Sequence, residues 1–312
     1  MNRLLLVSAA ASIALTPVFA QDNFTLQDNH TEELSCSRAR FCEMREDKAS
    51  ATGQFAVDGI HNGSVTVRGW SRNEVRIRWR VSTDSYNEKD AKDLFQKIHT
   101  HVSGSRASVD GPDRTFSNWV DGSNWDVSVE IFAPYKTALK LEAHNGSIAA
   151  SDIAGQVDAR SHNGQVKLER IQGNVDASSH NGSIRLTGVS GSAVFEAHNG
   201  QVNLTGLQGD VRGTSHNGST TIELAGKSTP TRRVDLESHN GGITLGIPSA
   251  FALRVHTETD HGGVSSDFPT TVRSNGGMHR IDNNLRDFEI GSGNGMTVRI
   301  HTNNAGIRLK RL

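Results

Sequence analysis

Histidine recurs at a fixed interval in this sequence, and its spacing could support chemistry. It precedes Asn-Gly at five positions that are 18 residues apart, namely His144, His162, His180, His198 and His216. If equivalent residues lie in neighbouring strands, their imidazoles are roughly 5 Å apart, and two of them could share a Zn²⁺, Cu²⁺ or Ni²⁺ ion. These five histidines are therefore the candidate metal ligands, and the direction in which they point decides whether they can bind.

The same interval predicts the fold that would position them. A strict 18-residue step is typical of stacked copies of one unit, each burying its apolar side against the next. Each copy divides into two halves, because residues 163–171 can be laid over 172–180 with glycine second and apolar residues fourth and sixth. Such alternation indicates a strand with one buried face, and Asn-Gly suits a tight corner. We therefore predict an all-β β-solenoid with about 18 residues per coil.

The overlay of the two halves also predicts where the histidines point. It equates them with apolar corner residues, namely Ile153, Ile171, Val189 and Leu207. We therefore expect a mostly inward stack of neutral imidazoles that are bonded to backbone or asparagine groups. An outward column that senses protons or binds metal remains the alternative.

Other candidate sites have weaker patterns. His99 and His101 would share a face of an extended segment, and His256, Asp260 and His261 are near in sequence. A metal site needs three or four converging ligands, which neither group supplies by itself. Calcium-binding nonapeptide repeats need an aspartate in the turn, and the turns here lack it.

No catalytic residue is predicted. The sequence has no Gly-x-Ser-x-Gly elbow, and no long insertion between residues 144 and 219 would wall a cleft. We expect no enzyme activity and no cofactor. Trp119 and Trp125 flank a short polar segment and could instead form a platform on which a sugar stacks.

The beginning of the chain predicts export. Residues 1–20 contain Arg3, an apolar run over 4–15 and a small residue at Ala20, which together fit a signal peptide cleaved after Ala20. We expect a periplasmic or secreted protein. No later apolar run is long enough to cross a membrane, and a formal net charge of −1 argues against a nucleic-acid partner.

Two cysteines follow in a polar segment without regular secondary structure that we expect over residues 21–50. Five residues separate Cys36 from Cys42, and in an oxidising compartment this spacing favours a local disulfide.

An N-terminal β region is expected over residues 51–143, continuous with solenoid repeats over 144–312. In its segment 74–81, Arg76, Arg78 and Arg80 alternate with apolar residues, which predicts a solvated strand face. A capping box at 85–88 begins an amphipathic helix over 87–99 that would cover one end or side of the stack. Residues 296–302 and 307–309 are expected to form the last pair of strands.

Several of these features together resemble the bacterial putative-adhesin family. They are Gly69-Trp70 at the end of a strand, the short helix, the proline-bearing link to Asn-Gly corners, and a terminal Gly-x-Gly strand followed by residues 302–307. The likeness covers roughly residues 50 to 312. It implies a β-solenoid of repeated Asn-Gly turns in an exported bacterial protein of unknown function, and it supplies no catalytic residues.

These observations favour a non-enzymatic surface-interaction, adhesin-like or scaffold protein whose partner is an envelope polymer or another protein. Two alternatives stay open. One is a glycan-binding or carbohydrate-active protein that uses the tryptophans, and the other is a metal- or pH-responsive envelope protein that uses the histidines.

Overall fold

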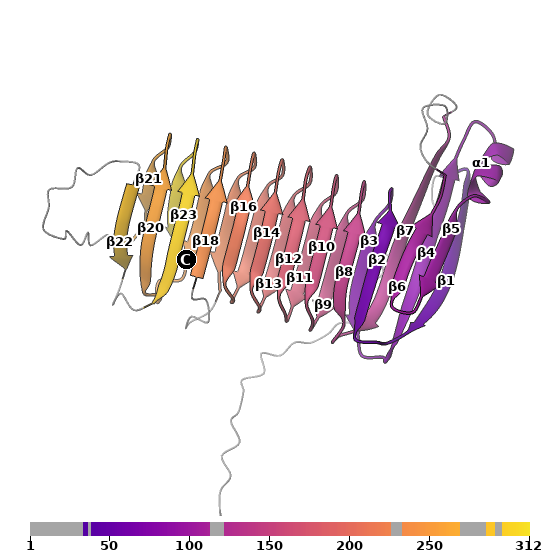
Figure 1. The fold of residues 1–312 in the computed structure, drawn as a ribbon, viewed down its shortest axis with the longest axis horizontal. Coiled ribbons are helices and arrows are strands. Elements are labelled where there is room, and N and C mark those ends of the chain that lie inside the picture. The colour runs from indigo at the N-terminus through magenta and orange to yellow at the C-terminus, as the bar shows by residue number, and fades with distance from the viewer. Residues whose placement is uncertain (1–33, 37–38, 113–121, 226–232, 269–284, 291–294) are drawn as a thin grey trace, which may run out of the picture. The chain divides into compact units, whose positions relative to one another are not determined.

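The alternating strands of the sequence form two twelve-stranded sheets in the computed structural model (Figure 1). The structure describes residues 34–36, 39–112, 122–225, 233–268, 285–290 and 295–312. The predicted signal peptide and Trp119 lie outside these residues, whereas residues 34–312 belong to one unit. None of the helices described is long and apolar enough to span a membrane.

Each sheet is a continuous ladder of hydrogen-bonded strands. In spatial order, sheet A contains β1 (Phe41–Ser50), β4 (Glu74–Asp84), β7 (Asn124–Pro134), β3 (Val65–Trp70), β9 (Ile148–Ile153), β11 (Val166–Ile171), β13 (Ile184–Val189), β15 (Val202–Leu207), β17 (Thr220–Leu224), β19 (Ile243–Ile247), β24 (Ile307–Arg311) and β21 (Val264–Ser266). Sheet B contains β22 (Leu285–Ile290), β20 (Leu253–Thr259), β23 (Met296–Thr302), β18 (Arg233–Ser238), β16 (Val211–Ser215), β14 (Ala193–Ala197), β12 (Val175–Ser179), β10 (Val157–Ser161), β8 (Ala138–Ala143), β2 (Gln54–Ile60), β6 (Arg106–Asp110) and β5 (His99–Ser103).

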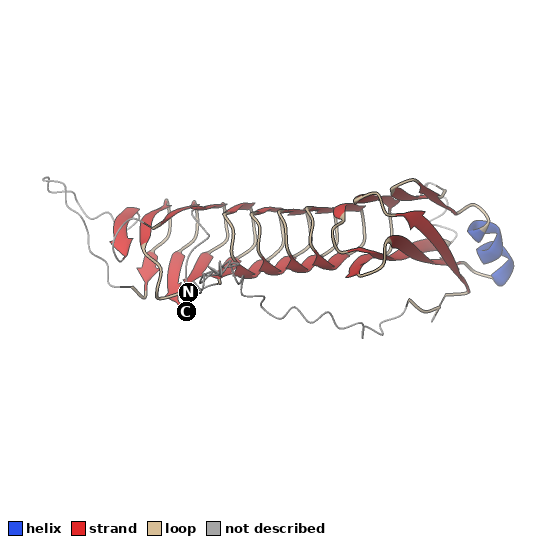
Figure 2. Cartoon of the chain, turned by 90° about the horizontal axis from the view of Figure 1, so that it is seen from below, coloured by secondary structure: helices blue, strands red, loops and turns tan. Residues whose placement is uncertain are grey.

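One coil of the stack consists of a sheet B strand, a His-Asn-Gly corner, a sheet A strand and a second corner. Parallel pairing joins equivalent residues of successive coils, so that Val157 faces Val175 and Val166 faces Ile184. The two sheets lie face to face with the coils linking them (Figure 2). The predicted β-solenoid with two strands per coil is confirmed.

The core lies between the sheets. Val157 and Ala159 from sheet B and Val166 and Leu168 from sheet A are each 0% exposed. Alternate residues of strands β8 to β18 supply this interior, so the apolar period of two in the sequence becomes one buried face per strand.

The second corner differs from the His-Asn-Gly corner in its backbone. Asp152, Arg170, Gly188 and Gly206 occupy the same position in successive coils and have φ values of 62°, 54°, 67° and 71°. A residue with a left-handed backbone changes the direction of the chain. The side chain of the residue that follows each of these four, such as Ile171, therefore points into the core. The two halves of a coil are therefore not equivalent where they end.

Both ends of the stack depart from sequence order. The coil of β2 and β3 lies between the coils of β6/β7 and β8/β9, and the coil of β23 and β24 lies between those of β18/β19 and β20/β21 (Figure 1). The expected last pair of strands is thus last in sequence but not in space. β23 lies between β18 and β20, and its apolar residues Val298 and Ile300 are buried in the core between these two strands.

The N-terminal end corrects two predictions. β1 occupies residues that were expected to be irregular, and α1 spans Glu88–Phe95 rather than 87–99. Asn87 is the N-cap, because its side chain accepts a hydrogen bond from the Asp90 N–H, whereas Ser85 is buried and bonds to Ser123. The helix packs on β1, where the rings of Phe95 and Phe41 meet at 4.8 Å.

The arginine face of β4 is paired rather than solvated. Arg76 contacts Glu46 at 2.6 Å, Arg78 contacts Glu130 at 3.1 Å, and Arg80 contacts Asp126 at 2.8 Å. The prediction of a solvated face was wrong because the acidic residues belong to strands that are distant in sequence. Nearby, Cys36 and Cys42 form a disulfide with Cα atoms 5.7 Å apart.

Candidate functional site

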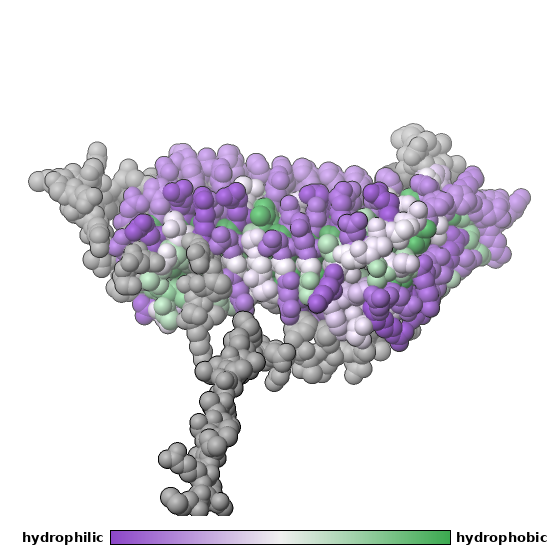
Figure 3. All heavy atoms as spheres, turned by 60° about the horizontal axis from the view of Figure 1, so that its bottom comes forward, coloured by the Kyte–Doolittle hydropathy of each residue, from purple (hydrophilic) through white to green (hydrophobic). Residues whose placement is uncertain are grey.

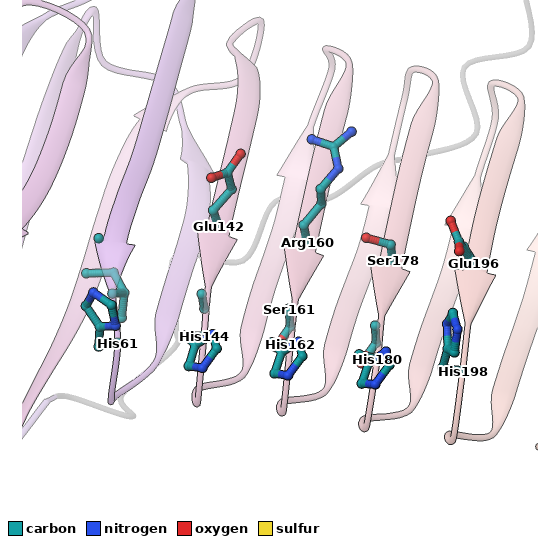
Figure 4. Close-up of a pocket in the computed structure, with 14 residues that line it drawn as sticks. His61, Glu142, His144, Arg160, Ser161, His162, Ser178, His180, Glu196 and His198 are labelled. Carbon is teal, nitrogen blue, oxygen red and sulfur yellow. The ribbon is translucent and has the colours of Figure 1, made fainter. Parts of the chain in front are cut away.

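The regular histidines form one column along the stack. Successive His-Asn-Gly corners place these side chains one above another, as Figure 4 shows for its first part, and we call the set the histidine column: His61, His144, His162, His180, His198, His216 and His239. Ring centroids from His144 to His216 are 4.8, 4.8, 4.6 and 4.4 Å apart, and the two outer steps are 6.1 and 6.0 Å. The spacing matches the expected strand separation.

The column points outward, so the prediction of an inward stack was wrong. Six of its histidines are exposed and His198 is half-buried. The inward position at this corner belongs to the preceding residue, such as Ser179, which is 3% exposed. Its hydroxyl donates to the Gly164 carbonyl at 3.0 Å and accepts from the Gly182 N–H at 2.9 Å. The overlay failed because, in the coils that it compared, only the opposite corner contains the left-handed residue that turns an apolar side chain inward.

A second ladder runs beside the histidines and was not predicted. After the first, each of its asparagines donates a side-chain hydrogen bond to the preceding one over 2.6 to 3.0 Å, and together they are Asn62, Asn145, Asn163, Asn181, Asn199, Asn217, Asn240 and Asn304. Asparagine ladders of this kind reinforce stacked parallel strands. The sequence signal was the shared 18-residue period, which we had attributed to the turn alone. The ladder holds the corners, and therefore the histidine column, in register.

An open groove of about 610 Å³ follows the column on sheet B. Its other wall is a row of outward side chains two residues before each histidine, namely Glu142, Arg160, Ser178 and Glu196 (Figure 4). We call this feature the column groove. Because each coil from His144 to His198 adds one imidazole and one polar side chain, the groove repeats the same pair of positions along this part of the stack.

Charge in the column groove is mixed. The Glu142 carboxylate pairs with Lys140 at 2.9 Å, and the Arg160 guanidinium pairs with Asp158 at 2.7 Å. Partial burial, together with the neighbouring His162 and His61, lowers the pKa of His144 because each of these effects disfavours its imidazolium form.

The column does not form a metal centre in the observed geometry. The rings of His144, His162 and His180 are parallel to within 2° and have centroids 4.8 Å apart, so their in-plane nitrogen lone pairs lie in separate parallel planes. Two lone pairs must converge to meet one ion at roughly 2.0–2.1 Å. No group of three His, Cys, Asp or Glu side chains suited to a metal ion occurs among the residues that the structure describes.

The other candidate residues are engaged elsewhere. His101 contacts Asp110 at 3.1 Å, and His256 contacts Asp287 at 2.6 Å. Trp125 is only 6% exposed and donates its indole N–H to the Pro112 carbonyl, which leaves no free ring face of the kind that a sugar-stacking platform requires. The surface in Figure 3 is mainly hydrophilic, with scattered hydrophobic residues.

The repeated corners and the ordered ends agree with a known family. The model of Toastrack DUF4097 matches residues 60–307. The chain belongs to this family. The predicted resemblance to a family of adhesin-like proteins of unknown function is thereby confirmed. Toastrack membership establishes the fold of the chain and leaves its ligand open.

Solved structures with some likeness to this Toastrack chain share little of its sequence. A putative adhesin from Bacteroides fragilis is 10% identical, with 88% of this chain and 98% of that one covered and a TM-score of 0.46. A putative cell adhesion protein from Clostridium sporogenes is 10% identical, with 86% and 100% covered and a TM-score of 0.28. A putative lipid binding protein from Parabacteroides distasonis is 12% identical, with 86% and 94% covered and a TM-score of 0.36. Among curated proteins, none matches.

Proposed function

We propose that this protein is an exported, non-enzymatic surface-interaction protein of the bacterial envelope, and that its column groove binds an extended polymer. The observation that carries the proposal is repetition: the groove presents an imidazole and a polar side chain at each coil (Figure 4). Equivalent groups at equal spacing suit a ligand that is itself periodic. A catalytic site, by contrast, needs different groups that converge on one reacting atom.

The polar side chains of the groove wall support a polar ligand. The large hydrophobic side chains exposed in the described part of the chain are Met44, Tyr86, Val194 and Leu312, and they lie on separate elements. A protein partner that docked through an apolar core would need a contiguous apolar patch. The composition of residues 1–20 supports export, which would bring the groove to the polymers of the envelope.

A matched pair of tryptophan substitutions tests the proposal. Ser178→Trp would fill the middle of the column groove, whereas Thr187→Trp would add the same bulk to the outer face of sheet A on the same coil. The measurement is co-sedimentation of the protein with purified peptidoglycan and with purified envelope polysaccharides. We expect Ser178→Trp to weaken binding at least about tenfold and Thr187→Trp to leave it unchanged. Equal binding by both variants would exclude the groove as the binding site.

A further inference from the structure

The histidine column and the strands beside it form a face whose charge can reverse sign. On strands β8 to β18 of sheet B the outward cationic residues are Lys140, Arg160, Arg212 and Arg233, and the outward acidic residues are Glu142, Asp158, Asp176, Glu196, Asp235 and Glu237. These groups leave a net charge of −2 while the imidazoles are neutral. The six histidines that follow the same strands bring it to +4 when they are protonated.

On the other side of the column, the residues that directly follow the corners in the described part of the chain carry no charge that offsets this change. After each Asn-Gly stands an uncharged residue, namely Ser147, Gln165, Ser183, Gln201, Ser219 and Gly242, and the asparagine ladder is also neutral. At the two ends of the column, Asp126 is paired with Arg80, Asn303 occupies the level next to His239, and Asp260 occupies the level after that. A free carboxyl group is ionised above about pH 4.5, whereas a free imidazole gains its proton near pH 6.5. Burial raises the pKa of Asp158 above its ordinary value.

Protonation of the column is opposed by its own geometry. Neighbouring rings are 4.4 to 4.8 Å apart, so each new imidazolium repels the next, and their asparagine neighbours supply no counter-charge. A ligand with a row of negative charges would relieve this repulsion at every coil. Binding of such a ligand therefore strengthens proton binding by the column, and protonation strengthens ligand binding. The protein takes up protons when the ligand binds.

We propose that the column groove binds a linear acidic polysaccharide in its protonated state and releases it near neutral pH. This inference deepens the proposed function and rests on it. A polyuronate carries one carboxylate per sugar residue for the imidazolium groups. Its hydroxyl groups suit the neutral and charged polar side chains of the groove wall, such as Ser178 and Glu196.

The test measures binding of the full chain to polygalacturonate at about pH 5 and about pH 7.5 at one ionic strength. Pullulan serves as the neutral polysaccharide and inorganic polyphosphate as the non-carbohydrate polyanion. We expect polygalacturonate to bind at least about tenfold more tightly at the lower pH, with proton uptake detected by calorimetry in two buffers. Added salt should weaken this binding, because the ligand is held by charge.

Variants of the column assign the effect to its residues. Combining His162→Gln, His180→Gln and His198→Gln should reduce the pH ratio to about threefold or less, and lysine at the same three positions should extend tight binding to neutral pH. His99→Gln with His101→Gln is the matched control, since both are exposed histidines on β5 outside the column. These control substitutions should leave the tenfold ratio intact.

The outcomes separate the inference from the proposed function. Pullulan binding that is independent of pH and is lost in Ser178→Trp would preserve the proposed function and overturn the acidic ligand. Equal affinity for polyphosphate and polygalacturonate would overturn the polysaccharide assignment. A pH ratio that survives in the triple glutamine variant would overturn the role of the column. Absence of binding to every polymer, including envelope preparations, would overturn both proposals.

Discussion

The two corners of each coil solve the same geometric problem in different ways. At the His-Asn-Gly corner a strand of sheet B ends on an inward serine or alanine, and the next two side chains face solvent. At the opposite corner a left-handed residue precedes an apolar one, such as Ile171, which is 0% exposed. One corner therefore contributes to the core, and the other displays polar groups.

This difference separates stability from recognition within a single repeat. The opposite corner is held by burial and, in one coil pair, by the two hydrogen bonds from Arg170 to Asp152 at 2.7 Å. The His-Asn-Gly corner is held by the asparagine ladder and by the inward serines. The imidazoles belong neither to the asparagine ladder nor to the hydrogen bonds of the inward serines, so they can change charge without breaking the stack.

The largest expected contrast comes from truncating one side chain at each corner. Ile171→Ala removes a buried side chain that lies between Ile153 and Val189 and should lower the free energy of unfolding by about 2–5 kcal/mol. His162→Ala removes an exposed ring and should change the free energy of unfolding by about 0.5 kcal/mol or less. Urea unfolding of both variants checks the contrast. A similar loss for both would mean that the column is a structural element.

Two glycines sharpen the comparison at an intermediate scale. A Cβ atom on Gly182, at the His-Asn-Gly corner, would lie 2.0 Å from the Gly164 carbonyl oxygen. On Gly188, at the opposite corner, the nearest atom would be 3.9 Å away, but φ is 67°. One glycine is needed for close backbone approach and the other for its left-handed conformation.

Substitutions should therefore rank differently at the two glycines. Gly182→Ala is expected to cost about 1–3 kcal/mol through overpacking. Gly188→Asn should cost less than about 0.5 kcal/mol, because asparagine tolerates a left-handed backbone and Asp152 and Arg170 already adopt it in other coils. Thermal unfolding of the two variants provides the measurement. The reverse order would show that the left-handed backbone at Gly188 is more costly to substitute than the close backbone approach at Gly182.

The sequence was sufficient for whatever depends on local period. The alternation of apolar residues such as Val166 and Leu168 predicts a buried strand face, and the 18-residue step predicts the length of one coil. The sequence was insufficient where one backbone angle decides which way a side chain points. Neither aspartate nor arginine is a residue type that predicts the left-handed conformation of Asp152 and Arg170, and the histidines were therefore predicted to point inward when they point outward.

Long-range pairing was the other limit. β23 inserts next to β18 across a large separation in sequence, and Arg78 finds Glu130 on β7. Both depend on which strands become neighbours, and local pattern does not encode that choice. The asparagine ladder needed only one further step, since stacked identical corners bring identical side chains into contact.

Acidification should act on one corner only, and this is the smallest expected effect. At the opposite corner the hydrogen bond to Asp152 raises the pKa of the Arg170 guanidinium further above its ordinary value, so that arginine stays charged throughout the physiological range. At the other corner, burial and the neighbouring His162 and His61 lower the pKa of His144 in the folded protein. The unfolded chain then binds more protons than the folded one just below about pH 6.5, and stability should fall as the pH falls through this window.

Urea midpoints between about pH 7.5 and about pH 5 measure this loss. His144→Gln should flatten the decline because the variant has no imidazole to charge at that level of the column, whereas His99→Gln should leave it unchanged. Solvent around the exposed ring screens the repulsion, so the change should be smaller than either of the two contrasts above. If the decline is as steep in His144→Gln as in the parent protein, the acid sensitivity arises away from His144, and the two corners would not differ in their response to pH.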